Sequence, residues 1–97
     1  MCSRQFDAMS RRETVSVEVK NGKIVKLFHS YDDPGGSTFT VKREKNNWAE
    51  FKYCLHNVLN VLMLHNRDDF VTLLATINGR DPECYQLGLN MLNSSKE

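Results

Sequence analysis

Two alternating segments joined by the dipeptide Asn21-Gly22 constrain the fold of this chain more than any other feature. In residues 15–20, valines alternate with polar residues, which is typical of a half-buried strand. Asn-Gly is the strongest short hairpin signal, because both central positions of a type I′ turn need positive φ. The return strand runs from Lys23 to about Tyr31, and neither of its faces is purely apolar. The sequence therefore predicts an antiparallel hairpin with one candidate binding face.

The residues after this hairpin predict a turn, a further strand and a helix. The turn covers residues 32–36, and the strand covers residues 38–42. A helix is expected to start near residue 47, with one apolar stripe made of Trp48, Phe51, Leu55, Val58 and Leu62. Additional apolar residues widen this surface beyond one packing face. In so small a chain, we therefore expect this helix to serve both the core and a homodimer contact.

The C-terminal third is less regular. Residues 70–77, FVTLLATI, predict a strand, and Asn78-Gly79 predicts a turn, whereas residues 85–92 suit a strand and a helix equally. We predict a loosely packed or flexible arm over residues 1–13, a single domain over 14–93 and a frayed tail over 94–97. The expected fold class is α+β, with a curved antiparallel sheet backed by a helix and an added C-terminal strand or helix segment.

Composition narrows the classes of function. The 97 residues carry a formal net charge of +1, but residues 1–45 hold nine basic and six acidic side chains, a local excess suited to phosphate contact. Three scattered cysteines argue against a disulfide framework and for an intracellular, reducing compartment. No apolar run reaches the roughly 18 residues of a membrane helix, so no membrane partner is expected.

No motif predicts catalysis or a cofactor. The chain lacks a phosphate-binding glycine loop, and its histidines and cysteines lack the short paired spacing of structural zinc sites. Cys84 and a histidine are a conceivable nucleophile–base pair, although nothing in the spacing brings them together. We therefore expect a protein that is not an enzyme and that uses neither a metal nor a cofactor.

Basic and aromatic residues of the predicted sheet favour contact with a nucleic acid. Single-strand binders combine cations that neutralise phosphates with aromatic rings that stack on bases. The candidate binding residues are Lys20, Lys23, Lys26, His29, Tyr31, Lys42, Arg43 and Lys45, and the candidate stacking residues are Phe28 and Phe39. The alternative interpretation is that both phenylalanines belong to the core and that the lysines are solvated surface residues.

Residues 15–63 resemble the DNA-binding domain of the positive cofactor four family of transcriptional coactivators. The resemblance consists of VSV at residues 15–17, Gly22-Lys23, Tyr31, an Asp-Pro and Gly-rich loop, and a helix that begins W-x-x-F-K at Trp48. Phe6 matches the aromatic residue that opens the family domain. The loop after Tyr31 is several residues shorter than in the family.

The resemblance implies a sheet backed by a helix, a homodimer packed largely through helices, and binding of single-stranded or unwound DNA, or of RNA, on the curved sheet. It also implies contact with the transcription machinery and a location in the nucleus or another compartment that contains nucleic acid. Lys23 matches a basic residue of the family, and His29 stands where the family has arginine. Lys20 and Asp32 stand where the family has stacking aromatics, so stacking is expected from Tyr31, Phe28 or Phe39.

Two alternatives belong to other classes. A hairpin, a helix and a strand over FVTLLATINGR, in that order, match a ubiquitin-like β-grasp module that binds proteins, and this last segment resembles doublecortin domains. The other alternative is a small viral protein that uses the coactivator-like fold for assembly or for interference with its host.

Overall fold

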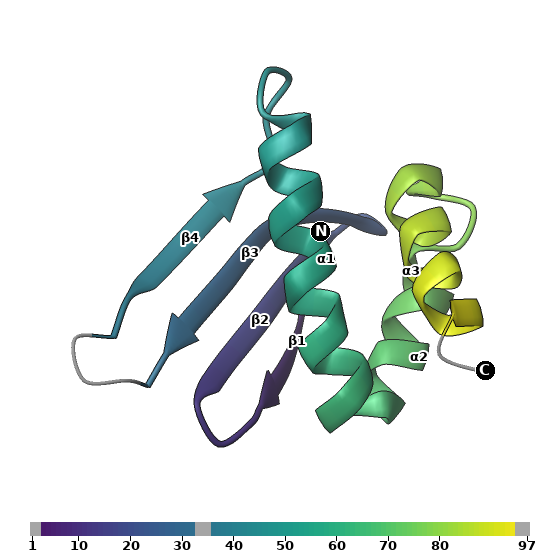
Figure 1. Ribbon diagram of the computed structural model, residues 1–97. Helices are drawn as coiled ribbons and strands as arrows, with labels where there is room; N and C mark the ends of the chain where they lie inside the picture. The colour runs from purple at the N-terminus through teal and green to yellow at the C-terminus, as the bar shows by residue number, and fades with distance from the viewer. Residues whose placement is uncertain (1–2, 33–35, 95–97) are drawn as a thin grey trace.

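The computed structural model describes residues 3–32 and 36–94, in which four strands precede three helices (Figure 1). The elements are β1 (Ser3–Met9), β2 (Glu13–Lys20), β3 (Lys23–Tyr31), β4 (Thr38–Lys42), α1 (Trp48–His65), α2 (Arg67–Ile77) and α3 (Pro82–Ser94). The predicted α+β class, with an antiparallel sheet backed by a helix, is confirmed. Residues 33–35 of the predicted turn and 95–97 of the predicted tail lie outside the described residues.

The sheet is a meander with the strand order β1-β2-β3-β4, and each neighbouring pair is antiparallel. The hairpin predicted at Asn21-Gly22 is confirmed. Asn21 and Gly22 have φ values of 55° and 78°, and Lys20 pairs with Lys23 across the turn. These positive φ values are those that a two-residue type I′ turn requires.

A β-bulge reverses the face of the sheet toward which the first side chains of β3 point. Lys26 pairs with Glu18 and Ile24 pairs with Val19, so that Val25 has no register partner. The extra residue turns Ile24 toward the helices, where it is fully buried beside Leu27. Unbroken alternation along β3 would instead place Ile24 on the opposite face, with Lys26 and Phe28.

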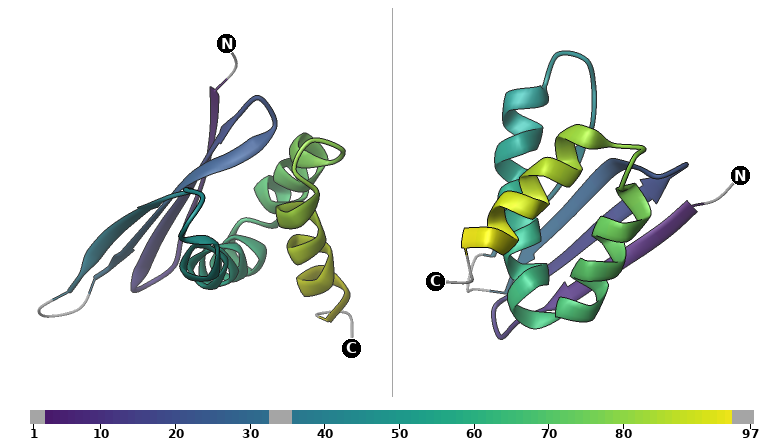
Figure 2. Two further views of the ribbon diagram at one scale, coloured as in Figure 1. Left: turned by 90° about the horizontal axis from the view of Figure 1, so that it is seen from above. Right: turned by 90° about the vertical axis from the view of Figure 1, so that its right-hand side faces the viewer.

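All three helices lie on one side of the sheet, and the other side stays uncovered (Figure 2). Helix α1 crosses β1–β3 and contributes its predicted apolar stripe to the core, where Phe51, Leu55, Val58 and Leu62 are fully buried and Trp48 is half-buried. The additional apolar residues of α1, such as Cys54 and Val61, are also buried within the same chain, and both α2 and α3 pack against this helix. The width of the apolar surface of α1 is thus explained without a second subunit.

Two predicted segments are wrong. The N-terminal arm includes β1, which pairs along its whole length with β2 and buries Phe6 and Ala8. Residues 70–77 are helical, because Phe70, Leu73, Leu74 and Ile77 fall on one helical face, and all four are buried. The β-grasp alternative loses the strand on which it rested, since no strand follows α1 in the described part of the chain.

Residues 85–92, which the sequence left undecided, belong to α3. The asparagine-glycine pair before it forms the turn between α2 and α3, with Gly79 at φ 79°. Among the described helices, none combines the length and the apolar character needed to cross a bilayer.

Candidate nucleic-acid interface

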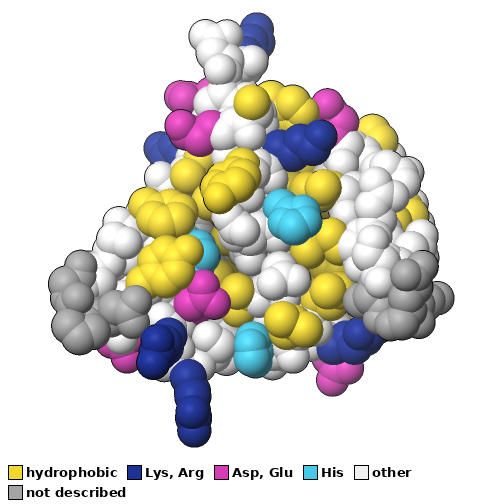
Figure 3. Space-filling view, viewed as in Figure 1, with side chains coloured by type: hydrophobic (Ala, Val, Ile, Leu, Met, Phe, Trp, Pro, Cys, Tyr) yellow, Lys and Arg dark blue, Asp and Glu magenta, His cyan; other side chains and the backbone are white. Residues whose placement is uncertain are grey.

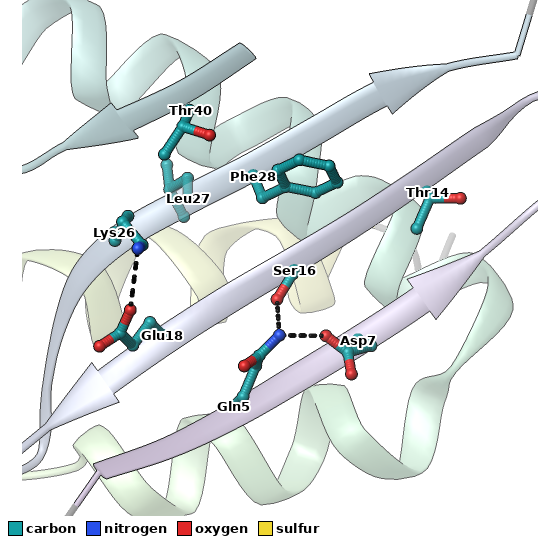
Figure 4. Close-up of a pocket in the computed structure, with 9 residues that line it drawn as sticks. All are labelled: Gln5, Asp7, Thr14, Ser16, Glu18, Lys26, Leu27, Phe28 and Thr40. Carbon is teal, nitrogen blue, oxygen red and sulfur yellow. Dashed lines mark hydrogen bonds and ion pairs between the residues drawn. The ribbon is translucent and has the colours of Figure 1, made fainter. Parts of the chain in front are cut away.

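The uncovered side of the sheet, here called the open face, presents polar side chains from all four strands. Alternation along each strand turns Val15, Val17 and Leu27 toward the helices and their neighbours toward the open face. A shallow groove of about 380 Å³ runs over this face (Figure 4). Its lining consists of Gln5, Asp7, Thr14, Ser16, Glu18, Lys26, Leu27, Phe28 and Thr40.

Four of the predicted cationic residues share this face. Lys20 and Lys26 lie on either side of Glu18, at Nζ–Oε distances of 3.9 and 3.5 Å. Lys23 pairs with Lys20 in the hairpin, and Lys42 pairs with Lys26 across β3 and β4. The side chains of Lys23 and Lys42 therefore point to the same face as those of their partners. Within residues 3–32 and 36–94, no carboxylate forms an ion pair with Lys23 or Lys42.

The described part of the open face carries one aromatic side chain, that of Phe28. It stands on β3 between Ser16 of β2 and Thr40 of β4, its two register partners, and it is half-buried at the side of the groove. Large apolar rings are usually buried in the core. A ring on a solvent-facing sheet surface, among hydroxyl and amide groups, therefore suggests a binding role. Its ring is available for contact with a flat apolar partner.

Acidic and amide side chains also line the groove. Gln5 donates hydrogen bonds from Nε2 to Ser16 Oγ (2.7 Å) and to Asp7 Oδ1 (3.1 Å), which orients these three side chains (Figure 4). Asp7 and Glu18 are the carboxylates that line the groove, and the four lysines named above outnumber them on the same face. Sequence reasoning missed the residues from β1, because it did not predict this strand.

Three predicted site residues point to the opposite side of the sheet. His29, Tyr31 and Phe39 form a ring cluster beside α1, with centroid distances of 4.4 Å between His29 and Tyr31 and 5.3 Å between His29 and Phe39. His29 is 1% exposed, and its Nε2 lies 3.2 Å from Glu13 Oε1. The structure therefore contradicts the prediction that His29 contacts nucleic acid, because the side chain is not accessible.

Tyr31 and Phe39 are accessible, but from the helix side. Phe39 is 39% exposed, and Figure 3 shows hydrophobic side chains gathered at the surface beside α1, over β3 and β4. Burial, together with the nearby Glu13 carboxylate, raises the pKa of the Tyr31 hydroxyl. Neither ring shares a surface with the lysines of the open face, so a strand that follows those lysines meets Phe28 instead.

Arg43 and Lys45 lie beyond the end of β4 and differ in their surroundings. Arg43 forms ion pairs with Asp81 (Nη1–Oδ2, 2.8 Å) and Glu83 (Nη2–Oε1, 3.2 Å), which engage its guanidinium within the fold. Lys45 is exposed in the loop before α1. We therefore assign Arg43 a structural role and leave it out of the proposed interface.

Among the described residues, the other reactive side chains form no site. Cys84 is buried in the core, and burial, with the carboxylate of Asp81 nearby, raises the pKa of its thiol far above the usual range. A protonated, inaccessible thiol cannot serve as a nucleophile. In the described part of the chain, no three His, Cys, Asp or Glu side chains are grouped so as to hold a metal ion.

Comparisons of the chain with protein-family models, curated proteins and solved structures find no match in any of the three. The resemblance to the coactivator family therefore stays a prediction.

Proposed function

We propose that this chain binds single-stranded nucleic acid on the open face, without catalysis. The observation that supports this proposal best is the position of Phe28, half-buried at a shallow groove and accompanied on the same face by Lys20, Lys23, Lys26 and Lys42. Cations for the phosphates and a ring for a base are the two components that non-specific single-strand binders combine.

The groove favours a single strand over a duplex. A base can stack on Phe28 only if one of its own faces is free, and both faces of a base are covered within a duplex. Stacking of one base contributes about 1–3 kcal/mol. With one aromatic ring on the described part of this face, the expected affinity is modest and depends weakly on base sequence.

Glu18 does not prevent phosphate binding by its lysines. Its ion pairs with Lys20 and Lys26 are at the surface, where such pairs contribute about 0–1 kcal/mol. A phosphate can therefore replace Glu18 as the partner of either ammonium group. Lys23 and Lys42, which form no ion pair with a described carboxylate, need no such exchange.

The resemblance to the positive cofactor four family is a second support. On that ground alone, we include in the proposal a role in transcription, within the nucleus or another compartment that holds nucleic acid. The open face offers the same contacts to DNA and to RNA, and the proposal covers both.

The first prediction tests the interface by charge reversal. Lys26→Glu is expected to weaken binding of a fluorescent oligo-dT at least about fivefold, because one phosphate contact becomes a repulsion. Phe28→Ala is expected to weaken it by about tenfold, the equivalent of a stacking contribution of about 1.4 kcal/mol. Fluorescence anisotropy at 50 mM and 200 mM salt, with a matched duplex alongside, measures both changes.

The matched control is Lys52→Glu, which makes the same charge change at an exposed position of α1, on the helix side of the sheet. It should leave affinity within about twofold of the unaltered chain, since it changes only the long-range field. Equal losses in the Lys26 and Lys52 variants would mean that net charge, not the open face, governs binding. Absence of oligonucleotide binding by the unaltered chain at low salt would refute the proposed function.

A further inference from the structure

Strand β4 is an edge of the sheet that nothing in the described fold covers. Its five residues, Thr38–Lys42, are exposed on both faces except for half-buried Val41. Figures 1 and 2 show β4 at the side of the sheet away from α2 and α3. Proteins usually protect such an edge with proline, a bulge or inward-pointing charge, because its free backbone groups pair readily with another strand. The sequence TFTVK has neither proline nor a bulge, and its one charge stands at its end.

The hydrogen bonds at the two ends of β4 determine which backbone groups are free. Tyr31 N donates to Ser37 O, and Arg43 N donates to Val25 O, both at 2.9 Å. Along a strand of an antiparallel pair, residues whose N–H and C=O groups bond to the neighbouring strand alternate with residues whose N–H and C=O groups point away from it. Phe39 and Val41 therefore bond to β3, whereas the N–H and C=O groups of Thr38, Thr40 and Lys42 point away from it.

The other edge of the sheet is protected. Asn66, at the junction of α1 and α2, donates from Nδ2 to the backbone oxygen of Asp7 at 2.7 Å, and α2 packs against β1. A strand approaching β1 would have to displace this side chain. The contrast between the two edges singles out β4 as the pairing edge.

We propose that two copies of this chain associate by antiparallel pairing of β4 with β4, about a two-fold axis at Thr40. In this register, Thr40 faces its counterpart, Thr38 faces Lys42, and the free backbone groups of all three residues find partners. Phe39 faces Val41 on the helix side, an aromatic–β-branched pair that stabilises a sheet and covers part of a ring that is 39% exposed.

Other registers are less favourable. A two-fold axis at Lys42 places two ammonium groups directly opposite each other, which is destabilising. An axis at Thr38 leaves Val41 and Lys42 opposite no residue of the partner's β4. The axis at Thr40 uses the whole strand, and identical patches meeting about a two-fold axis are the commonest form of homodimer.

This pairing also extends the open face, an extension that matters functionally only if the proposed function holds. Thr40 is the register partner of Phe28, and Lys42 is that of Lys26. Pairing through β4 therefore brings the two Phe28–Lys26 regions together across one seam, so that one nucleic-acid strand can cross both copies.

The test uses the residue that faces its own copy. Thr40 is exposed, so Thr40→Lys and Thr40→Glu leave the folded chain intact but place two like charges opposite each other in the dimer. Both variants are expected to sediment as monomers under conditions where the unaltered chain is a dimer. An equimolar mixture of the two is expected to recover the dimer, because Lys then faces Glu. The control, Thr14→Lys on β2 of the same open face, should stay dimeric.

Sedimentation is measured without nucleic acid, so its outcome is separate from that of the binding proposal. A monomeric unaltered chain at roughly 100 µM, where interfaces of micromolar Kd are saturated, would overturn the pairing. Dimers that persist in both Thr40 variants would overturn it too, as would a mixture that stays monomeric. Far-ultraviolet circular dichroism of each variant verifies that the fold is retained.

Discussion

Asp81 is a buried carboxylate that contacts residues far from it in the sequence. It is 2% exposed, accepts a hydrogen bond from Ile24 N (3.0 Å) and pairs with Arg43 (2.8 Å). Arg43 also donates to Ile24 O at 3.3 Å and lies over the ring of Trp48, 5.2 Å from its centroid. Burial by itself lowers the pKa of Arg43, but the hydrogen bond to Asp81 and the nearby charges outweigh it, and the net shift is upward. These contacts connect β3, β4 and α1 to the turn before α3.

Arg43→Ala is expected to lower the free energy of unfolding by about 3 kcal/mol, because it leaves the Asp81 carboxylate buried without a counter-charge. Urea unfolding followed by circular dichroism measures this change. Lys45→Ala, two residues further along and exposed, should change stability by less than about 0.5 kcal/mol. A loss below about 1 kcal/mol for Arg43→Ala would contradict this structural role of the Arg43–Asp81 pair.

Helix α2 has a sequence pattern that fits both a strand and a helix, and contacts with the rest of the chain favour the helix. The run FVTLLATI is rich in β-branched residues and predicts a strand, yet its apolar positions also fit a helical face. Asn66 precedes the helix and accepts a hydrogen bond from Asp69 N (3.4 Å) as its N-cap, and it also binds β1 through Asp7 O. One side chain therefore both starts α2 and attaches it to the edge of the sheet.

Asn66→Ala is expected to cost about 1–2 kcal/mol of stability, since it removes the cap of α2 and the donor to β1 together. Asn66→Ser keeps an oxygen able to cap the helix but is too short to reach β1, so it should recover about half of the loss. Chemical denaturation of both variants gives these values. Identical losses for alanine and serine would contradict the capping role.

The folded chain has two layers, with helices on one side of the sheet and an uncovered face on the other (Figure 2). The core between them includes Cys84, whose thiol pKa is raised by burial. A raised pKa in the folded state gives stability that is fully present below the pKa of the unfolded thiol, about 8.5. This stability is lost as the pH rises, because the unfolded chain ionises first and is favoured.

Stability is therefore expected to fall between pH 8 and pH 10, with one such thiol contributing a slope of up to about 1.4 kcal/mol per pH unit. Cys84→Val removes this titrating group and should make the decline shallower. Burial raises the pKa of Cys54 as well, so a smaller slope is expected to remain. Thermal unfolding across this pH range measures the effect. An unchanged slope in the variant would mean that Cys84 does not titrate on unfolding.

The elements whose signals are local could be predicted from the amino-acid sequence. Asn21-Gly22 specified its hairpin through the φ values that a two-residue turn demands, and the apolar stripe of α1 specified the core face of that helix. Both signals depend on neighbours within a few residues, where backbone sterics and periodicity leave few solutions. The prediction of a sheet backed by this helix follows from the same patterns.

The division of the candidate site residues between the two faces of the sheet depends on long-range contacts of the folded chain. The bulge at Val25, the burial of His29 and the pairing of Arg43 with Asp81 separate residues that the sequence had grouped as one basic and aromatic site. Arg43 and Asp81 are far apart along the chain, and no local pattern shows that they meet. Which face a side chain occupies, and whether a charge is free or already paired, depends on these long-range contacts. The open face, with Phe28 among its lysines, is therefore a property of the folded chain.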